Sequence, residues 1–167
     1  MKEPLFKRVM TLLLVVLMSF SGMSVKAVSA DSSSTWEKVT DIAEAAESGK
    51  SIAITMTASD GTVYVLPAKQ TSSAPSAITV SKSDTELTTD GVETDYGWTV
   101  TAEEDGYTFV NDGGYYLYVI NNNNGVKVNT KPTSGYLWNI ADDYLMAVDP
   151  SNNTRYLGVY TSNPDWR

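Results

Sequence analysis

Residues 98–125 read WTVTAEEDGYTFVNDGGYYLYVINNNNG, and residues 138–163 read WNIADDYLMAVDPSNNTRYLGVYTSN. The two stretches correspond without a gap, because Trp98 matches Trp138 and Leu117 matches Leu157 at the same offset, 138 − 98 = 40 residues. A repeat of this period indicates one supersecondary unit used more than once, since so small a unit cannot bury its own apolar face. The repeat predicts how the chain is built and leaves its chemistry open.

The N-terminal segment, residues 1–30, has the pattern of a secretory signal peptide. Basic residues come first, residues 9–20 are almost continuously apolar, and Val28-Ser29-Ala30 is a small-residue cleavage site. The apolar run is shorter than the roughly 20 residues of a membrane-spanning helix, so no membrane association is expected after cleavage. We therefore expect a secreted protein, extracellular or at the cell surface. Residues 31–35 would be a polar tether and residues 36–167 a single domain.

The chain is acidic and lacks two reactive residue types. Its formal net charge is −8, and it contains neither Cys nor His. An acidic surface repels nucleic-acid backbones, so a nucleic acid is not an expected partner. The missing residue types exclude a Ser-His-Asp triad, a cysteine nucleophile, His-ligated metals and disulfides. Carboxylates such as Glu103 and Asp142 lie in predicted turns, without the opposed geometry of a glycosidase. No catalytic residue, metal site or cofactor is predicted, and the protein is not expected to be an enzyme.

One short helix is expected near the start of the domain, at residues 41–48. Asp41 and Glu44 have the spacing of a capping box, and Gly49 suits a left-handed C-terminal cap. The rest of the domain reads as short alternating strands between turn signals, beginning at residues 51–57. The expected fold class is therefore all-β.

Three tryptophans give the expected strands a common frame. Trp36, Trp98 and Trp138 would each begin one unit of mostly four strands and form a core layer. Three such units predict a β-trefoil-like barrel, and a β-sandwich is the alternative. In this frame the chain stops at Arg167 inside the third unit, so we expect a domain truncated at its C-terminus.

The repeated strands carry tyrosines opposite their aliphatic residues. Alternation places Leu117 and Val119 on one face, which predicts core, and the tyrosines on the other. Flat rings of this kind stack on the C–H faces of sugars, and neighbouring Asn side chains bond sugar hydroxyls. The candidate ligand-binding residues are Tyr116, Tyr118, Tyr156, Tyr160, Trp166 and Asn123. The alternative is that the tyrosines are ordinary strand residues and the Asn runs are turn residues.

Residues 107–125, followed by Trp138-Asn-Ile, resemble the repeats of ricin-type lectin-like β-trefoil modules. The end of the chain, from Arg155 to Arg167, is similar to a module of secreted and surface proteins of gut bacteria. This resemblance implies a scaffold rather than a sugar site. Neither Trp98 nor Trp138 is preceded by the Gln-x that marks ricin-type sites, so no lectin residue is carried over.

These observations favour a non-catalytic accessory module that binds a glycan or a surface as part of a longer bacterial extracellular protein. The alternative is a structural spacer beside a hydrolase domain located beyond Arg167. The sequence alone does not choose between the two, because fold does not imply function.

Overall fold

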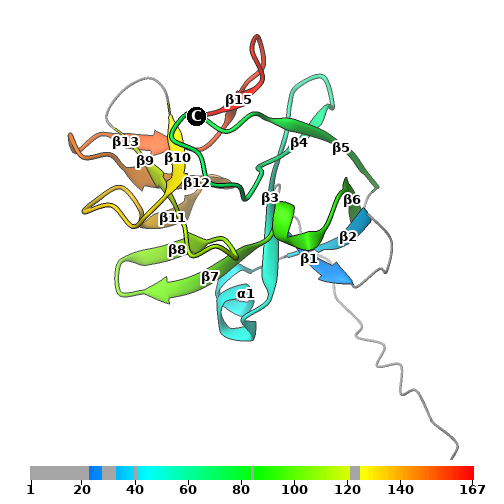
Figure 1. Cartoon of the computed structure of the whole chain (residues 1–167), viewed down its shortest axis with the longest axis horizontal. Helices are drawn as coiled ribbons and strands as arrows, with labels where there is room; N and C mark the ends of the chain where they lie inside the picture. The colour runs from blue at the N-terminus through cyan, green and yellow to red at the C-terminus, as the bar shows by residue number, and fades with distance from the viewer. Residues whose placement is uncertain (1–22, 28–32, 40, 84, 121–124) are drawn as a thin grey trace, which may run out of the picture.

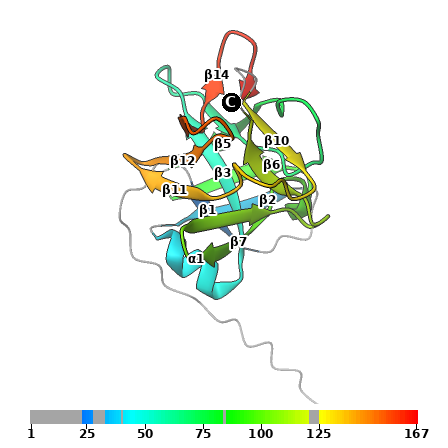
Figure 2. The same ribbon diagram turned by 90° about the vertical axis from the view of Figure 1, so that its left-hand side faces the viewer.

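The structure is a computed structural model, and it describes residues 23–27, 33–39, 41–83, 85–120 and 125–167. Figures 1 and 2 show two views of the chain. The elements in chain order are β1 (Met23–Ala27), β2 (Ser33–Lys38), α1 (Ile42–Ser48), β3 (Ser51–Thr57), β4 (Val63–Val65), β5 (Ile78–Lys82), β6 (Glu86–Asp90), the 3₁₀ turn η1 (Glu93–Asp95), β7 (Trp98–Glu103), β8 (Gly106–Val110), β9 (Tyr116–Val119), β10 (Val126–Asn129), β11 (Trp138–Ala141), β12 (Tyr144–Val148), β13 (Thr154–Tyr156), β14 (Val159–Tyr160) and β15 (Asp165–Trp166).

The domain is all-β, as predicted, and is built on one large antiparallel sheet. Its strand order is β1-β2-β6-β5-β4-β3-β7-β8-β11-β12-β13, while β9 pairs with β8 and carries β10 on its other side. Strands β14 and β15 form a separate two-stranded sheet. The three-unit barrel and the sandwich both remain predictions.

Strand β1 lies between two strands of the sheet. Ser24 is opposite Lys38 of β2 on one side and opposite Ala53 of β3 on the other. This strand falls within residues 1–30, so the predicted leader contains an ordered part of the sheet. The pairing of β2 also corrects the predicted polar tether of residues 31–35. Ser33 to Thr35 are the first residues of β2, because they pair with β6. The Ser34 side chain is buried, and its hydroxyl donates to the Gly91 carbonyl at 3.3 Å.

Helix α1 has the boundaries that its capping residues predict. The Asp41 carboxylate accepts a hydrogen bond from the Ala43 N–H at 2.8 Å, which satisfies one unpaired donor of the first turn. Gly49 ends the helix in the left-handed conformation with a φ of +61°. Ile42 and Ala45 are buried, so this face of the helix packs onto the core.

The β3–β4 hairpin separates two apolar clusters. Ile52 and Ile54 of β3 belong to the larger cluster, whereas Ala53, between them, belongs to the smaller one. Tyr64 and Val65 of β4 are divided in the same way. Both faces of this hairpin are therefore buried, because successive side chains of a strand point in opposite directions. In Figure 1, β3 runs through the middle of the molecule.

The three predicted core tryptophans do not form a single layer. Trp98 and Trp138 lie in the larger cluster, as expected for equivalent residues of a repeat. Trp36 is also buried, but it lies in the smaller cluster, where its indole N–H donates to the Thr89 hydroxyl at 3.0 Å. Trp166 occupies the larger cluster with Trp98 and Trp138.

The two repeated units share one turn whose hydrogen bonds can be compared atom by atom. The Asn111 side-chain oxygen accepts from the Tyr115 N–H at 2.9 Å, and the Asp149 carboxylate accepts from the Asn153 N–H at 2.9 Å. In both turns the first N–H donates to the carbonyl four residues later. The turns are separated by 149 − 111 = 38 residues, not 40. The ungapped correspondence in sequence therefore hides a shift of two residues in the structure.

Candidate ligand-binding site

The predicted division of side chains on β9 is confirmed. Leu117 and Val119 are buried in the larger cluster, and Tyr116 and Tyr118 lie half-buried on the opposite face. After β13, Leu157 is again buried. The five predicted ligand residues that the structure describes nevertheless do not form one surface.

Trp166 is a core residue. Its ring is 1% exposed, its indole N–H donates to the Val65 carbonyl at 3.2 Å, and its backbone N–H donates to the Pro75 carbonyl at 2.8 Å. This ring is not available to stack on a ligand. The burial comes from segments about 90 and 100 residues earlier in the chain, which strand periodicity does not reveal. Asn123 lies outside the described residues.

Tyr116 is engaged in a cation–aromatic group. Its ring meets that of Tyr136 edge to face, with centroids 6.2 Å apart and planes at 84°. The Lys131 ammonium lies 5.3 Å from the Tyr116 centroid and 4.6 Å from the Tyr136 centroid. This cation covers surface that a sugar would need, so the group is a poor stacking platform. Tyr118 lies nearby on β9, opposite Lys127 of β10.

Tyr160 has its ring face occupied in a similar way. The Arg167 guanidinium lies 4.1 Å from the ring centroid, and it is held by the Asp165 carboxylate with a 2.7 Å contact between Nε and Oδ1. Hydrogen bonding to Asp165 raises the pKa of Arg167, so the guanidinium keeps its charge over the ring.

Tyr156 belongs to an open aromatic pair with a residue that the sequence analysis did not select. The ring of Tyr144 meets it edge to face, with centroids 6.4 Å apart and planes at 82°. Tyr144 is 50% exposed and Tyr156 is 52% exposed. Within the part of the chain that the structure describes, no Lys or Arg lies over either ring. Alternation on β12 could have identified Tyr144, because Leu145 and Ala147 occupy the buried face.

Cross-strand register gives this pair its neighbours. Asn139, Met146 and Tyr156 are directly opposite one another on β11, β12 and β13, and therefore share one face of the sheet. Val148 is 45% exposed on the same face of β12. We call Tyr144, Tyr156, Met146 and Asn139 the tyrosine face. It combines two exposed rings with an amide and a thioether.

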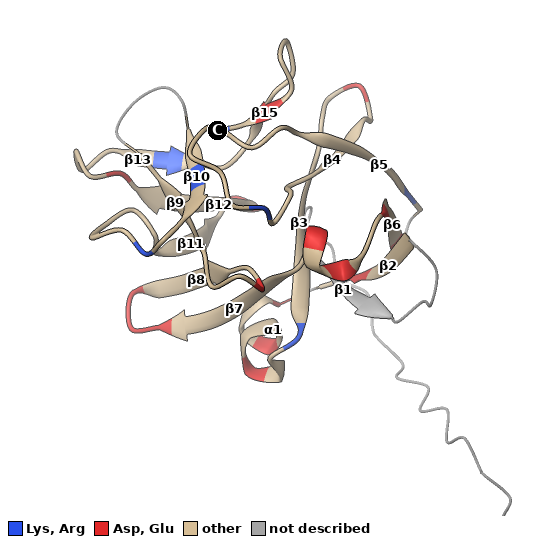
Figure 3. Cartoon of the chain, viewed as in Figure 1, with Lys and Arg blue, Asp and Glu red and all other residues tan. Residues whose placement is uncertain are grey.

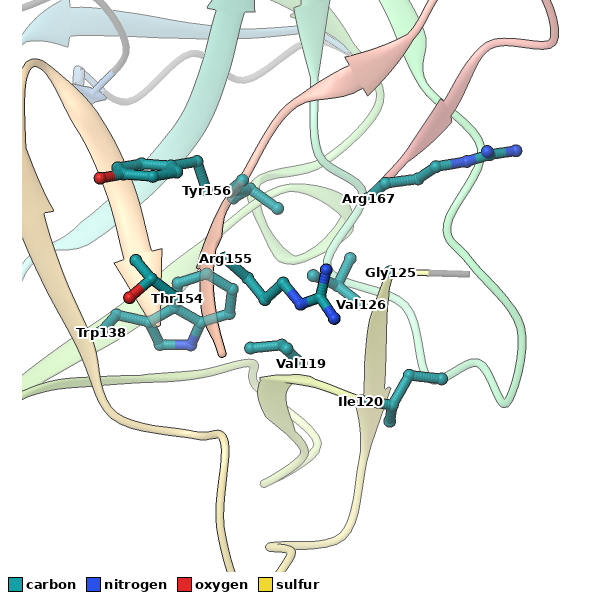
Figure 4. Close-up of a pocket in the computed structure, with 10 residues that line it drawn as sticks. Val119, Ile120, Gly125, Val126, Trp138, Thr154, Arg155, Tyr156 and Arg167 are labelled. Atoms are coloured by element: carbon teal, nitrogen blue, oxygen red, sulfur yellow. The ribbon is translucent and has the colours of Figure 1, made fainter. Parts of the chain in front are cut away.

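A cavity of about 390 Å³ lies beside β13. Figure 4 shows the residues around it, which come from β9, β10, β11, β13 and the end of the chain. Its lining consists of Val119, Ile120, Gly125, Val126, Trp138, Thr154, Arg155, Tyr156, Leu157 and Arg167. This volume lies near the lower end of the usual range for ligand pockets, about 300–1,000 Å³. Tyr156 contributes to the cavity lining and to the tyrosine face, whereas the register places Arg155 with Trp138 and Ala147 on the opposite face of the sheet.

Arg155 is fixed by a buried carboxylate. Its Nε and Nη2 atoms each lie 2.8 Å from Oδ2 of Asp149, whose side chain is inaccessible to solvent. The N–H of Asn153 lowers the pKa of the Asp149 carboxyl to about 2, and the Arg155 and Ser151 donors act in the same direction against desolvation. The carboxylate is therefore ionised at neutral pH, and it restricts the guanidinium to one orientation.

Charge is unevenly distributed around the cavity. Both charged residues that line it are arginines, although the chain as a whole has a net charge of −8. Figure 3 shows basic residues on β10 and β13, whereas acidic residues gather at the β7–β8 turn and around α1. The cavity thus lies in the less acidic part of the surface. Among the described residues, no group of three or more His, Cys, Asp or Glu side chains is placed to hold a metal ion.

Comparison of the chain with protein-family models, with curated proteins and with solved structures gives no match. The resemblance to ricin-type modules therefore remains a prediction. In the described part of the chain, no helix has the length and apolar character required to span a membrane.

Proposed function

We propose that this protein is a non-catalytic, secreted module that binds glycans through the tyrosine face. The exposed pair of Tyr144 and Tyr156 is the observation that carries the proposal. Aromatic rings that remain open to solvent offer apolar, electron-rich surfaces to the C–H groups of a sugar ring. Secretion is supported by the signal-peptide pattern in residues 1–30, and cleavage after Ala30 would remove β1 from the sheet.

The neighbours of the two rings suit the same ligand. The Asn139 amide nitrogen donates to the Asp105 carbonyl at 3.1 Å, and its side-chain oxygen is an acceptor for a sugar hydroxyl beside the apolar surface of Met146. The register places both residues on the face of Tyr156. Ligand sites commonly combine much apolar area with a few polar groups that fix orientation. A β-trefoil-like arrangement of three units is part of this proposal, supported by the two related turns at Asn111 and Asp149.

The experiment is a binding screen of the purified, secreted protein against soluble glycans, read by thermal shift and then by calorimetry. A ligand present at a hundred times its Kd stabilises the folded state by about 2.7 kcal/mol. Tyr144→Ala and Tyr156→Ala should each weaken binding about tenfold, which corresponds to about 1.4 kcal/mol. The matched control is Tyr116→Ala, because that ring already contacts Tyr136 and Lys131.

Two outcomes would contradict the proposal. The first is that no glycan shifts the melting temperature, which would favour a structural spacer. The second is that a glycan binds but the folded Tyr144→Ala and Tyr156→Ala variants retain full affinity. Loss of affinity in the Tyr116→Ala control alone would move the site to β9.

A further inference from the structure

The cavity beside Tyr156 carries an inference about which glycans are bound, and this inference rests on the proposed function. The walls are largely apolar, since Val119, Val126, Leu157 and Trp138 are all buried. Arg155 enters this apolar surrounding from β13. In Figure 4 its guanidinium lies between Trp138 and Gly125, in the middle of the lining residues.

The guanidinium is oriented before any ligand arrives. Its Nε and Nη2 atoms are both used by Asp149. A guanidinium has five N–H donors in a rigid fork, so the donors that do not face Asp149 are held in fixed directions. Because the side chain is already immobilised, a ligand that accepts these hydrogen bonds does not have to order it.

The chemistry of such a site favours a planar anion. Hydrogen bonds between guanidinium and carboxylate are charge-assisted and are stronger than those to a neutral hydroxyl. The Arg155 side chain is 40% exposed, so the charge and fork geometry of the acceptor, more than a low dielectric constant, set this preference. A neutral sugar would offer only hydroxyl acceptors to Arg155. A sugar that carries a carboxylate would offer a group with the matching geometry.

We propose that the cavity binds the carboxylate of an acidic sugar, a uronic acid, in a glycan whose neighbouring residues lie on the tyrosine face. Arg155 is the residue that recognises the carboxylate. It is directly opposite Ala147, which is opposite Trp138, so its side chain lies on the face of β13 that is opposite to the tyrosine face. Strand β13 is the last strand of the sheet, so the glycan reaches both faces by passing around this strand. Arg167 also lines the cavity, but its guanidinium is bound to Asp165 and stacked on Tyr160. In Figure 4 it points away from Arg155, so it takes no part in recognition.

The test compares matched ligands on the secreted protein by calorimetry. The ligands are uronic-acid oligosaccharides and the same oligosaccharides with their carboxyl groups methyl-esterified. The acidic forms should bind about ten- to a hundredfold more tightly, as expected for hydrogen bonds between charged groups. Arg155→Gln should abolish this difference and Arg155→Lys should preserve part of it. Arg167→Gln, which makes the same charge change on the cavity rim, should leave it unaltered.

The ligand comparison needs no variant, so it remains decisive if Arg155→Gln does not fold. Equal binding of acidic and esterified oligosaccharides, with affinity still dependent on Tyr144 and Tyr156, would overturn the inference and leave the proposed function standing. An acidic preference that survives Arg155→Gln in a folded protein would also overturn it. Failure of every glycan, acidic or neutral, to bind would overturn both.

Discussion

Replacing Trp138 with Phe should destabilise the protein much more than the same replacement at Trp98. The two residues occupy equivalent places in the repeat, and both are buried in the larger apolar cluster, with exposures of 1% and 0%. Each substitution removes the same atoms from a packed core. The packing cost should therefore nearly cancel when the two variants are compared.

What differs is the indole N–H. In Trp138 it donates to the Leu117 carbonyl at 3.0 Å, so Trp138→Phe removes a partner from a buried acceptor. This should cost about 1–3 kcal/mol beyond packing. The indole nitrogen of Trp98 is buried without a hydrogen-bond partner among the described residues. Trp98→Phe removes that desolvated donor and relieves a penalty of similar size. We expect the two variants to differ by about 2 kcal/mol or more.

The assay is urea unfolding followed by far-UV circular dichroism, which does not depend on tryptophan emission. Trp98→Phe should unfold near the wild-type midpoint, while Trp138→Phe should unfold at a clearly lower urea concentration with an unchanged m-value. Equal losses of stability in the two variants would refute the reasoning. That result would mean that the Trp98 N–H is satisfied, for instance by an internal water molecule.

Three further predictions concern the turn, the first strand and two glycines. The folded-state pKa of Asp149, about 2, lies below its ordinary value of 3.8, so its contribution to stability is complete above about pH 5 and is lost as the pH falls from about 4 towards 2. Asp149→Asn should flatten the fall in Tm over that window, because the neutral Asn111 supports the equivalent turn. A protein that begins at residue 31 lacks β1 and exposes the edges of β2 and β3, so it should melt earlier or self-associate relative to one that begins at Met23; identical melts and monomeric behaviour would contradict the role of β1. Gly49→Ala should cost about 1 kcal/mol from its φ of +61° alone. Gly125→Ala should cost more in the same urea titrations, since its Cβ would clash with the Cα atom of Arg167; equal costs would argue against that contact.

Features set by short-range interactions were predictable. Asp41 and Gly49 identify the ends of α1, because both caps act within one turn of the helix. The alternation of Leu117 and Val119 with tyrosines identifies the buried face of β9. Such patterns depend on backbone geometry over a few residues, and this geometry is the same in any fold.

The candidate site was only partly predictable. Tyr156 was predicted as a ligand residue and Tyr144 was not. Alternation on β12 places Tyr144 on the exposed face, but only the register of β12 and β13 brings the two rings together. The ungapped repeat also concealed the shift of two residues between the turns at Asn111 and Asp149. Sequence correspondence preserves the order of residues, while strand pairing decides which of them are neighbours.

The amino-acid sequence by itself determined that the chain is acidic, that it has no His or Cys chemistry, and that it forms short strands with one capped helix. The tertiary structure alone decided which aromatic rings remain open. Trp166 is buried in the larger apolar cluster, where the Val65 and Pro75 carbonyls accept its two N–H groups, and Arg167 lies over one face of the Tyr160 ring. The exposure of a side chain depends on contacts between distant segments, so residues with the same local sequence pattern differ in their exposure to solvent.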